Sequence, residues 1–320
     1  MQLKLIGAAV CAIAATTAFA ADTYPSKTVR LVVPFSPGGG NDISARFVAQ
    51  RLTEGFNQSA VVDNRPGAGS TLGTDIVAKS APDGYTLLVT HNAIAINQTL
   101  YSKLPYDTVR DFTQVAIIGT TTNTLVVNPN VPARSTKELI ALLKSKPDGL
   151  NYASTGAGGT SHLAMEYFRI ETGTKIVHIP YKGTAPGLTD VVGGQVQLMI
   201  SALPGTVPFI NSKRLVALAT TGKKRSAFLP DLPTLAESGV PGYEFDTWYG
   251  LHAPSKVSKE IITKLNTEIT KALSRQEVKD QLFRQGLEAQ TSTPEEFSKF
   301  VRSEVVKMAK IIKESGAKPE

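Results

Sequence analysis

The sequence predicts an α/β fold made of two lobes, with one lobe built from two separate stretches of the chain. Short apolar runs rich in β-branched residues alternate with periodic helical segments, a pattern typical of largely parallel sheets covered by helices. The chain has 320 residues, near the size at which one hydrophobic core splits into two. A Pro/Gly-rich stretch at 229–242 separates this alternating region from a helical C-terminal part.

Nine strands are expected, each short, apolar and bounded by turn residues. They cover residues 29–34, 60–63, 86–90, 115–118, 125–128, 151–154, 176–180, 196–201 and 215–220. Two capping boxes, which start at Ser135 and at Thr293, mark the beginnings of helices. The spacing therefore places a helix after most of the strands.

The C-terminal part predicts amphipathic helices at 259–274, 277–285 and 294–314. A chain that returns to its first lobe would cross over within the Pro/Gly-rich stretch, and an earlier crossing is expected near 121–128. We therefore expect lobe 1 to comprise residues 21–123 plus 243–320, and lobe 2 to comprise residues 124–242.

The first 20 residues predict a cleaved secretory signal peptide. Lys4 precedes the apolar run at 5–15, and Ala18-Phe19-Ala20 forms the small-x-small pattern at which signal peptidase cuts. Cys11, the only cysteine, lies inside this segment. We expect cleavage after Ala20 and a secreted mature chain without disulfides.

Composition and spacing exclude several kinds of partner. The formal net charge is +7, but basic residues are interleaved with acidic ones and form no basic stripe with aromatic residues, so we expect no nucleic acid. No later apolar run approaches the ~18 residues that span a bilayer, so we expect a soluble mature protein. The four histidines, at 91, 162, 178 and 252, lack metal-ligand spacing, so we expect no metal and no cofactor.

The loop after the first strand is a candidate ligand site. It contributes Phe35, Ser36, Gly39, Asn41 and Asp42 around three consecutive glycines, and it runs directly into a helix. Glycines let a backbone approach a ligand closely, and free amides at a helix N-terminus form an anion site. The alternative is a tight strand-to-helix turn. Asp42 would either contact a ligand or cap its helix.

A second loop of the same design follows the strand at 151–154. Its candidate residues are Ser154, Thr155, Gly156, Thr160, Ser161 and His162. Hydroxyls beside exposed amides suit an anionic ligand. The histidine would either line a cleft or hydrogen-bond its own loop.

Three further loops follow strands and supply the remaining candidates, which are Ser70, His91, Asn92, Tyr181 and Thr184. Two aromatic residues, Trp248 and Tyr249, follow the second expected crossover. They would either wall a cleft or fill the core, and the sequence leaves both possibilities open.

Catalytic and nucleotide patterns are missing. The sequence has no GxSxG elbow, no HExxH and no P-loop, and residues 67–73 match a dinucleotide fingerprint only loosely. A Ser-His-Asp triad that comes together only in the folded protein has no characteristic spacing in the sequence. A secreted α/β hydrolase that acts on a carboxylate is therefore retained as an alternative.

Nine short motifs occur in order along the chain. They are Pro25-Ser26-Lys27 with 29–34, the residues 35–42, Asn64-Arg65-Pro66-Gly67-Ala68-Gly69, Pro82-Asp83-Gly84-Tyr85-Thr86-Leu87, Tyr106-Asp107 with Asp111-Phe112, the residues 154–162, Tyr181-Lys182-Gly183, the residues 233–239, and Pro241-Gly242-Tyr243. In this order they resemble the Bug (Bordetella uptake gene) receptors, the solute-binding components of tripartite tricarboxylate transporters. The resemblance covers essentially the whole mature chain.

The resemblance implies a periplasmic-binding-protein (Venus flytrap) fold with lobe 1 discontinuous, a periplasmic location and a ligand held between the lobes. It implies a small carboxylate as ligand, which would be a di- or tricarboxylate, an acidic amino acid or an aromatic acid. Membrane permease subunits are the implied partners, and we expect a monomer. A receptor that feeds a membrane sensor kinase is a further alternative, and the motifs do not say which carboxylate is bound.

Overall fold

The computed structural model describes residues 24–181 and 183–319 and contains two β-sheets. The first sheet defines lobe 1 and has the strand order β11-β4-β10-β3-β1-β2. Its strands are β1 (Val29–Val33), β2 (Ala60–Asn64), β3 (Thr86–His91), β4 (Phe112–Thr121), β10 (Thr247–Pro254) and β11 (Glu288–Ala289). The predicted signal peptide lies outside the described residues.

The second sheet defines lobe 2 and has the strand order β7-β6-β8-β5-β9. Its strands are β5 (Asn123–Val127), β6 (Asn151–Ser154), β7 (Val177–Pro180), β8 (Leu198–Ala202) and β9 (Val216–Thr220). All nine predicted strands are present within a few residues of their expected bounds. The sequence did not predict β10 and β11.

The sheets are mixed rather than largely parallel. β1 pairs in parallel with β2 and β3, and β6 pairs in parallel with β7 and β8. By contrast, β10 runs antiparallel to β3 and β4, and β5 runs antiparallel to β8 and β9. The antiparallel strands β5 and β10 are those by which the chain enters each lobe from the other, so they run against the strands of the βαβ units.

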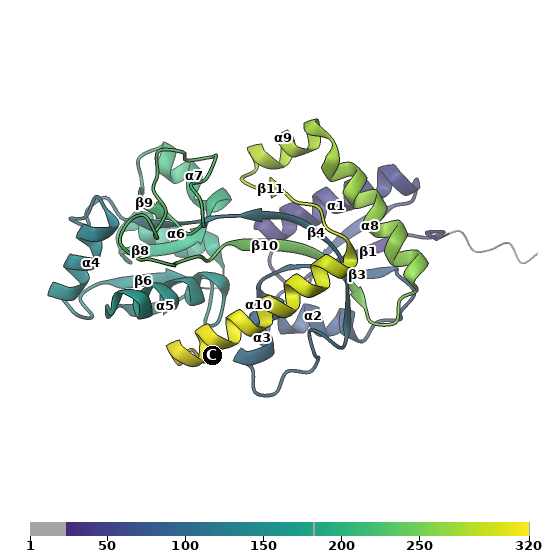
Figure 1. Cartoon of the computed structure of the whole chain (residues 1–320), viewed down its shortest axis with the longest axis horizontal. Coiled ribbons are helices and arrows are strands. Elements are labelled where there is room, and N and C mark those ends of the chain that lie inside the picture. The colour runs from purple at the N-terminus through teal and green to yellow at the C-terminus, as the bar shows by residue number, and fades with distance from the viewer. Residues whose placement is uncertain (1–23, 182, 320) are drawn as a thin grey trace, which may run out of the picture.

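Helices cover the sheets of both lobes, and the last helix spans them (Figure 1). Lobe 1 carries α1 (Gly40–Phe56), the short 3-10 helix η1 (Ala68–Ser70), α2 (Thr71–Ala78), α3 (Ala93–Leu100), α8 (Lys259–Ser274) and α9 (Gln276–Arg284). Lobe 2 carries α4 (Thr136–Ser145), α5 (Thr160–Thr172), α6 (Thr184–Gly193) and α7 (Leu203–Asn211). The helix α10 (Pro294–Ser315) packs against β4 and α3 of lobe 1 and against α5 of lobe 2.

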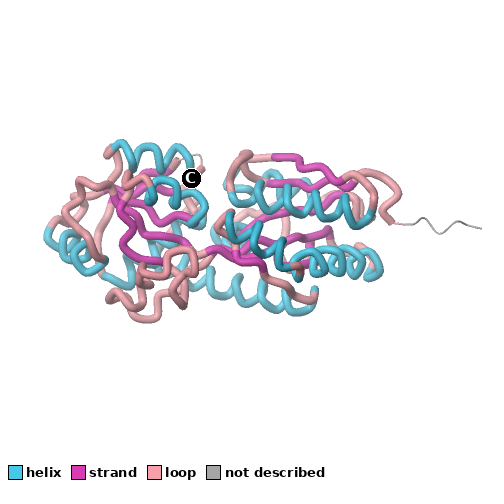
Figure 2. Tube along the Cα trace, turned by 90° about the horizontal axis from the view of Figure 1, so that it is seen from above, coloured by secondary structure: helices cyan, strands magenta, loops and turns pink. Residues whose placement is uncertain are grey.

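The chain passes between the lobes twice, once between β4 and β5 and once between β9 and β10. Extended strands join the two bodies where they meet (Figure 2). The Pro/Gly-rich stretch lies on lobe 2, where the Tyr243 hydroxyl donates to the Ala164 carbonyl at 2.5 Å, so the second crossing comes after it. This strand membership supports the division into 21–123 plus 243–320 and 124–242, which stays a prediction.

The core is continuous between the lobes. One buried apolar cluster extends from Leu88 in lobe 1 to Phe168 in lobe 2 by way of Met308 and Ile311 on α10. The C-terminal helix therefore contributes to the cores of both bodies. Among residues 24–181 and 183–319, no helix is long and apolar enough to cross a membrane.

Candidate ligand-binding site

The loop between β6 and α5 is held by its own hydroxyls. The Ser161 hydroxyl accepts from the Thr155 amide at 2.8 Å and lies 3.0 Å from the Thr155 hydroxyl. The fully buried Ser154 hydroxyl accepts from the Gly156 amide at 3.1 Å. The Thr160 hydroxyl differs from these, because it is buried and has no hydrogen-bond partner within the described chain. Of the four hydroxyls expected to face a ligand, Thr160 alone stays uncommitted.

His162 also binds this loop, and it stacks on a histidine that the sequence did not single out. Its Nδ1 accepts from the Gly158 amide at 2.8 Å, as one of the two expected roles requires. The ring lies 4.1 Å from that of His178 and nearly parallel to it, and the Tyr152 ring lies 4.8 Å from His178 and 6.3 Å from His162. Burial lowers the pKa of His162, with the Glu166 carboxylate opposing, so this ring is neutral at physiological pH.

Ser154 and His178 are the closest approach to a catalytic pair. The Ser154 hydroxyl lies 2.6 Å from His178 Nε2. However, Ser154 is completely buried, and its hydroxyl is already bonded to the Gly156 backbone. A substrate carbonyl has no access to this oxygen, so the contact fixes the loop and does not generate a nucleophile.

In lobe 1, the loop between β1 and α1 is closed by Asp42. This carboxylate accepts from the Gly38 amide at 3.0 Å and from Arg46 Nε at 2.9 Å. Burial alone would raise the pKa of Asp42, but these hydrogen bonds outweigh it and hold the pKa below its ordinary value. Asp42 thus fixes its own loop, while the Oδ1 atom of neighbouring Asn41 is buried without a partner in the described chain. Ser36 and Gly39 are exposed on this loop.

Three aromatic rings form a cluster beside this loop. Phe35 packs on His91 at 4.6 Å between ring centroids, and His91 lies edge-on to Tyr249 at 6.2 Å. His91 Nδ1 accepts from the Ala93 amide at 3.0 Å, at the start of α3. Burial lowers the pKa of His91 to about 4, so the ring is neutral and carries its proton on Nε2.

Asn92 was expected to contact a ligand. It lies at the second crossing between the lobes, which is called the hinge below. It is fully buried, and its side chain donates to the Asp246 carbonyl at 3.0 Å and accepts from the Trp248 amide at 3.0 Å. The Trp248 indole in turn donates to Glu304 on α10 at 3.0 Å. Asn92 therefore ties the end of β3 to the strand that enters lobe 1, and Trp248 fills core.

Ser70 is held in a strained loop on lobe 1. It has a φ of 79°, and its hydroxyl accepts from the Asn97 side chain at 3.0 Å. The same Asn97 amide group donates to the Gly69 carbonyl at 2.9 Å. The sequence could not show these two hydrogen bonds from Asn97, because Asn97 lies on helix α3, which was not predicted.

Tyr181 and Thr184 lie at the start of α6. The Tyr181 hydroxyl donates to Asp190 at 2.7 Å within the same βα unit, so it is used internally. Thr184 is the first residue of α6, directly after Gly183, whose φ is 127°.

Three helix starts are capped by a side chain, and three others begin directly after a glycine. α4, α8 and α10 are capped by the side chains of Ser135, Ser258 and Thr293. Capping boxes were predicted at Ser135 and at Thr293, and the complete box forms at Thr293. By contrast, α1, α5 and α6 each begin after a glycine that offers no side-chain cap. These three helices follow β1, β6 and β7, which are strands of parallel pairs. Their first amides are therefore left for another acceptor.

The two lobes meet at the second glycine loop. A Cβ atom at Gly158 would collide with the Leu100 side chain, at the end of α3 in lobe 1. Gly158 has a φ of 72°, which favours glycine on backbone grounds as well. The loop of lobe 2 is thus seated against lobe 1.

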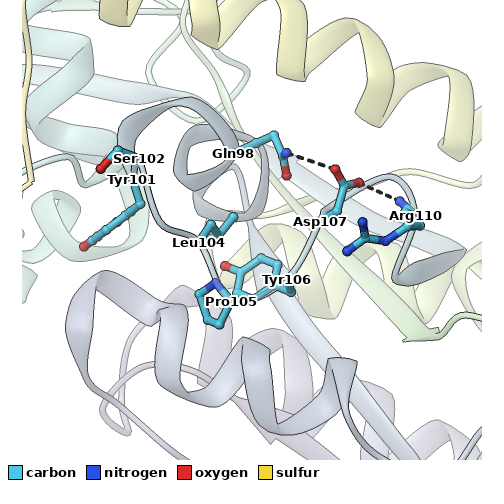
Figure 3. A pocket seen from close by; sticks show the side chains of 8 residues that line it. All are labelled: Gln98, Tyr101, Ser102, Leu104, Pro105, Tyr106, Asp107 and Arg110. Atoms are coloured by element: carbon cyan, nitrogen blue, oxygen red, sulfur yellow. Dashed lines mark hydrogen bonds between the residues drawn. The ribbon is translucent and has the colours of Figure 1, made fainter.

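A separate hollow of about 290 Å³ lies beyond the end of α3 (Figure 3). It is lined by Gln98, Tyr101, Ser102, Leu104, Pro105, Tyr106, Asp107 and Arg110. Asp107 accepts from the Gln98 side chain at 3.2 Å and from the Arg110 amide at 2.7 Å, so its polar lining is largely bonded internally. None of the predicted ligand residues lines it.

Two α/β lobes, each with a glycine-rich loop and an uncapped helix start, define a two-lobed binding protein. The family model described as the tripartite tricarboxylate transporter family receptor matches residues 44–317, and the chain belongs to this family. Its members are periplasmic solute-binding receptors and not enzymes, which confirms the predicted family and removes the hydrolase alternative.

Individual relatives agree along almost the whole chain. Protein BugT of Bordetella pertussis is 36% identical over 318 residues, covering 99% of this chain and 98% of BugT. The structure of R. palustris Rpa4515 with adipate is 37% identical with a TM-score of 0.89, over 93% of this chain and 100% of that one. MatC from Rhodopseudomonas palustris with bound malate is 30% identical with a TM-score of 0.84, over 90% and 100%. The predicted two-lobed fold class is thereby confirmed.

Proposed function

We propose that this protein captures a small carboxylate between its lobes in the periplasm and delivers it to the permease subunits of a tripartite tricarboxylate transporter. The uncapped starts of α1 and α5, one on each lobe, carry this proposal. Free amides at a helix N-terminus attract anions through hydrogen bonding and through the helix dipole. The adipate and malate in the two R. palustris structures support a carboxylate as the ligand class.

Lobe 2 holds the carboxylate in this proposal. Thr160 is the first residue of α5, and its hydroxyl is buried without a partner in the described part of the chain. A buried hydroxyl without a partner is unfavourable, and a carboxylate oxygen would satisfy it. The loop at 35–42 then closes over the ligand from lobe 1, with Phe35, Ser36, Gly39 and Asn41 facing it.

The expected affinity is moderate. Each helix start contributes about 0.3–1 kcal/mol, rising to about 2 kcal/mol in a partly buried site. Charge-assisted hydrogen bonds add about 1.5–3 kcal/mol each. Two or three such groups together reach about −8 kcal/mol, which corresponds to a Kd of about 1 μM.

The substitution Thr160→Asp tests the carboxylate site. It places a negative charge at the first residue of α5, so calorimetric titration with malate, adipate, citrate, glutamate and benzoate should show anion binding abolished. Thr189→Asp makes the same change at an exposed position of α6 and should bind like the wild type. Unchanged affinity in Thr160→Asp would contradict the placement of the carboxylate.

Secretion and delivery have their own tests. N-terminal sequencing of the periplasmic protein should read Ala21-Asp22-Thr23, as cleavage after Ala20 requires. Sedimentation of the purified protein should give the mass of a monomer. Uptake of labelled ligand by cells that carry the permease should require this protein, and uptake that persists at the same rate without it would contradict delivery.

A further inference from the structure

The strand β10 supplies a polar group that points to the ligand site from lobe 1. Tyr249 stands directly opposite His91 in the antiparallel pair of β10 and β3, so both side chains project from the same face of the sheet. A Cβ atom at Gly40 would collide with the Tyr249 hydroxyl, which therefore lies against the first residue of α1. The third glycine of the loop is needed because this hydroxyl occupies the space.

The Tyr249 hydroxyl has no hydrogen-bond partner among the described residues. The residue is 2% exposed, and its hydroxyl makes no hydrogen bond within the described chain. Burial raises the pKa of Tyr249, so the hydroxyl keeps its proton and acts as a donor. With no acceptor inside the chain, this hydroxyl is free to donate to an acceptor that arrives at the start of α1.

His91 offers a second donor of the same kind. Because its Nδ1 accepts from the Ala93 amide, the neutral ring carries its proton on Nε2. This N–H has no acceptor among the residues described. The Phe35 ring packs against the His91 ring at 4.6 Å between centroids.

We propose that Tyr249 and His91 form a subsite on lobe 1 for a second acceptor of the ligand, and that this subsite selects dicarboxylates over monocarboxylates. The inference rests on the proposed carboxylate capture and adds to it. One carboxylate is held at the start of α5, and the other lies at the start of α1, where two uncharged donors and the free amides of the helix face it.

The test compares pairs of ligands that differ by one carboxylate. Each dicarboxylate from four to eight carbons is titrated beside the monocarboxylate of the same length, against wild type and Tyr249→Phe. The wild type should prefer the dicarboxylate. Tyr249→Phe should lower affinity for that dicarboxylate about 10-fold, the size expected of one charge-assisted hydrogen bond, and leave the monocarboxylate within about 2-fold.

Tyr243→Phe is the matched control. It removes another buried tyrosine hydroxyl, one bonded to the Ala164 carbonyl in lobe 2, and should leave the ratio of the two affinities unchanged. Equal losses for both ligands in Tyr249→Phe, or no loss for the dicarboxylate, would overturn the subsite while carboxylate capture stands. If no carboxylate binds the wild type, the proposed function fails, and the subsite fails with it.

Discussion

We expect Asp246 to make the stability of the second crossing between the lobes sensitive to pH. It lies just before β10, where the chain enters lobe 1 for the second time, and its carboxylate is 3.5 Å from the Thr221 hydroxyl at the end of lobe 2. Burial raises the pKa of Asp246 from 3.8 to about 6, with a hydrogen bond from Thr122 opposing. The two crossings of the chain therefore meet around one carboxyl group whose pKa is raised.

The effect on stability follows from this shift. A raised pKa means that the folded state holds the proton more tightly than the unfolded state. The stabilisation is fully present below pH 3.8 and is lost as the pH rises through about 6. At about 1.4 kcal/mol per pKa unit, the loss approaches 3 kcal/mol once the carboxyl is ionised. This figure is an upper bound, because the side chain is partly exposed.

The substitution Asp246→Asn removes the titration while keeping the shape of the side chain. Guanidinium unfolding, followed by the fluorescence of the chain's one tryptophan, measures the free energy of unfolding at about pH 4 and about pH 8. The variant should match the wild type at the lower pH and exceed it by about 2–3 kcal/mol at the higher. Asp231→Asn, at an exposed position, controls for the lost charge. Parallel pH profiles for wild type and Asp246→Asn would refute the reasoning.

Two further substitutions test the contact between the lobes and the hinge network. Gly158→Ala should weaken ligand binding measured by calorimetry, because the added Cβ collides with the Leu100 side chain. Gly173→Ala is the control, since this glycine has a φ of 61° and open space around it. It should lower the free energy of unfolding by about 1 kcal/mol without changing the affinity for the ligand. Similar ligand affinities in Gly158→Ala and Gly173→Ala would contradict the contact between the lobes. Glu304→Ala leaves the Trp248 indole without its acceptor. It should lower the free energy of unfolding by about 1–3 kcal/mol and shift the fluorescence of Trp248. A loss below about 0.5 kcal/mol would show that this bond contributes little.

The alternation of strands and helices was predictable, but two elements were not. β10 is buried along all eight residues, so it shows no period of two, and Gly250 interrupts its apolar pattern. α3 is a short apolar helix of eight residues with no capping side chain, and a run of that kind is ambiguous between helix and strand. Both elements lie where the lobes meet, and the second crossing comes after the Pro/Gly-rich stretch in which it was expected.

The site was predictable only as far as its loops. The glycines at 38–40 and at 156, 158 and 159 identify the two loops, and the glycine before each helix offers no side-chain cap. The sequence does not show which hydroxyls stay free, because that depends on partners such as Ser161 for Thr155 and His162 for Gly158. His178 reaches His162 because β7 pairs with β6, which leads into α5, and the two histidines share no sequence motif.

Trp248 and Tyr249 are neighbours on β10 and face opposite sides of the sheet. Neighbouring residues on a strand point to opposite faces. Trp248 accordingly faces α10, where its indole binds Glu304, and Tyr249 faces α1 and His91. Because Asn92 bonds the Trp248 backbone and His91 pairs with Tyr249, the end of β3 is tied to both faces of β10. In the proposed subsite, a ligand bound to Tyr249 would therefore contact the strand by which the chain enters lobe 1.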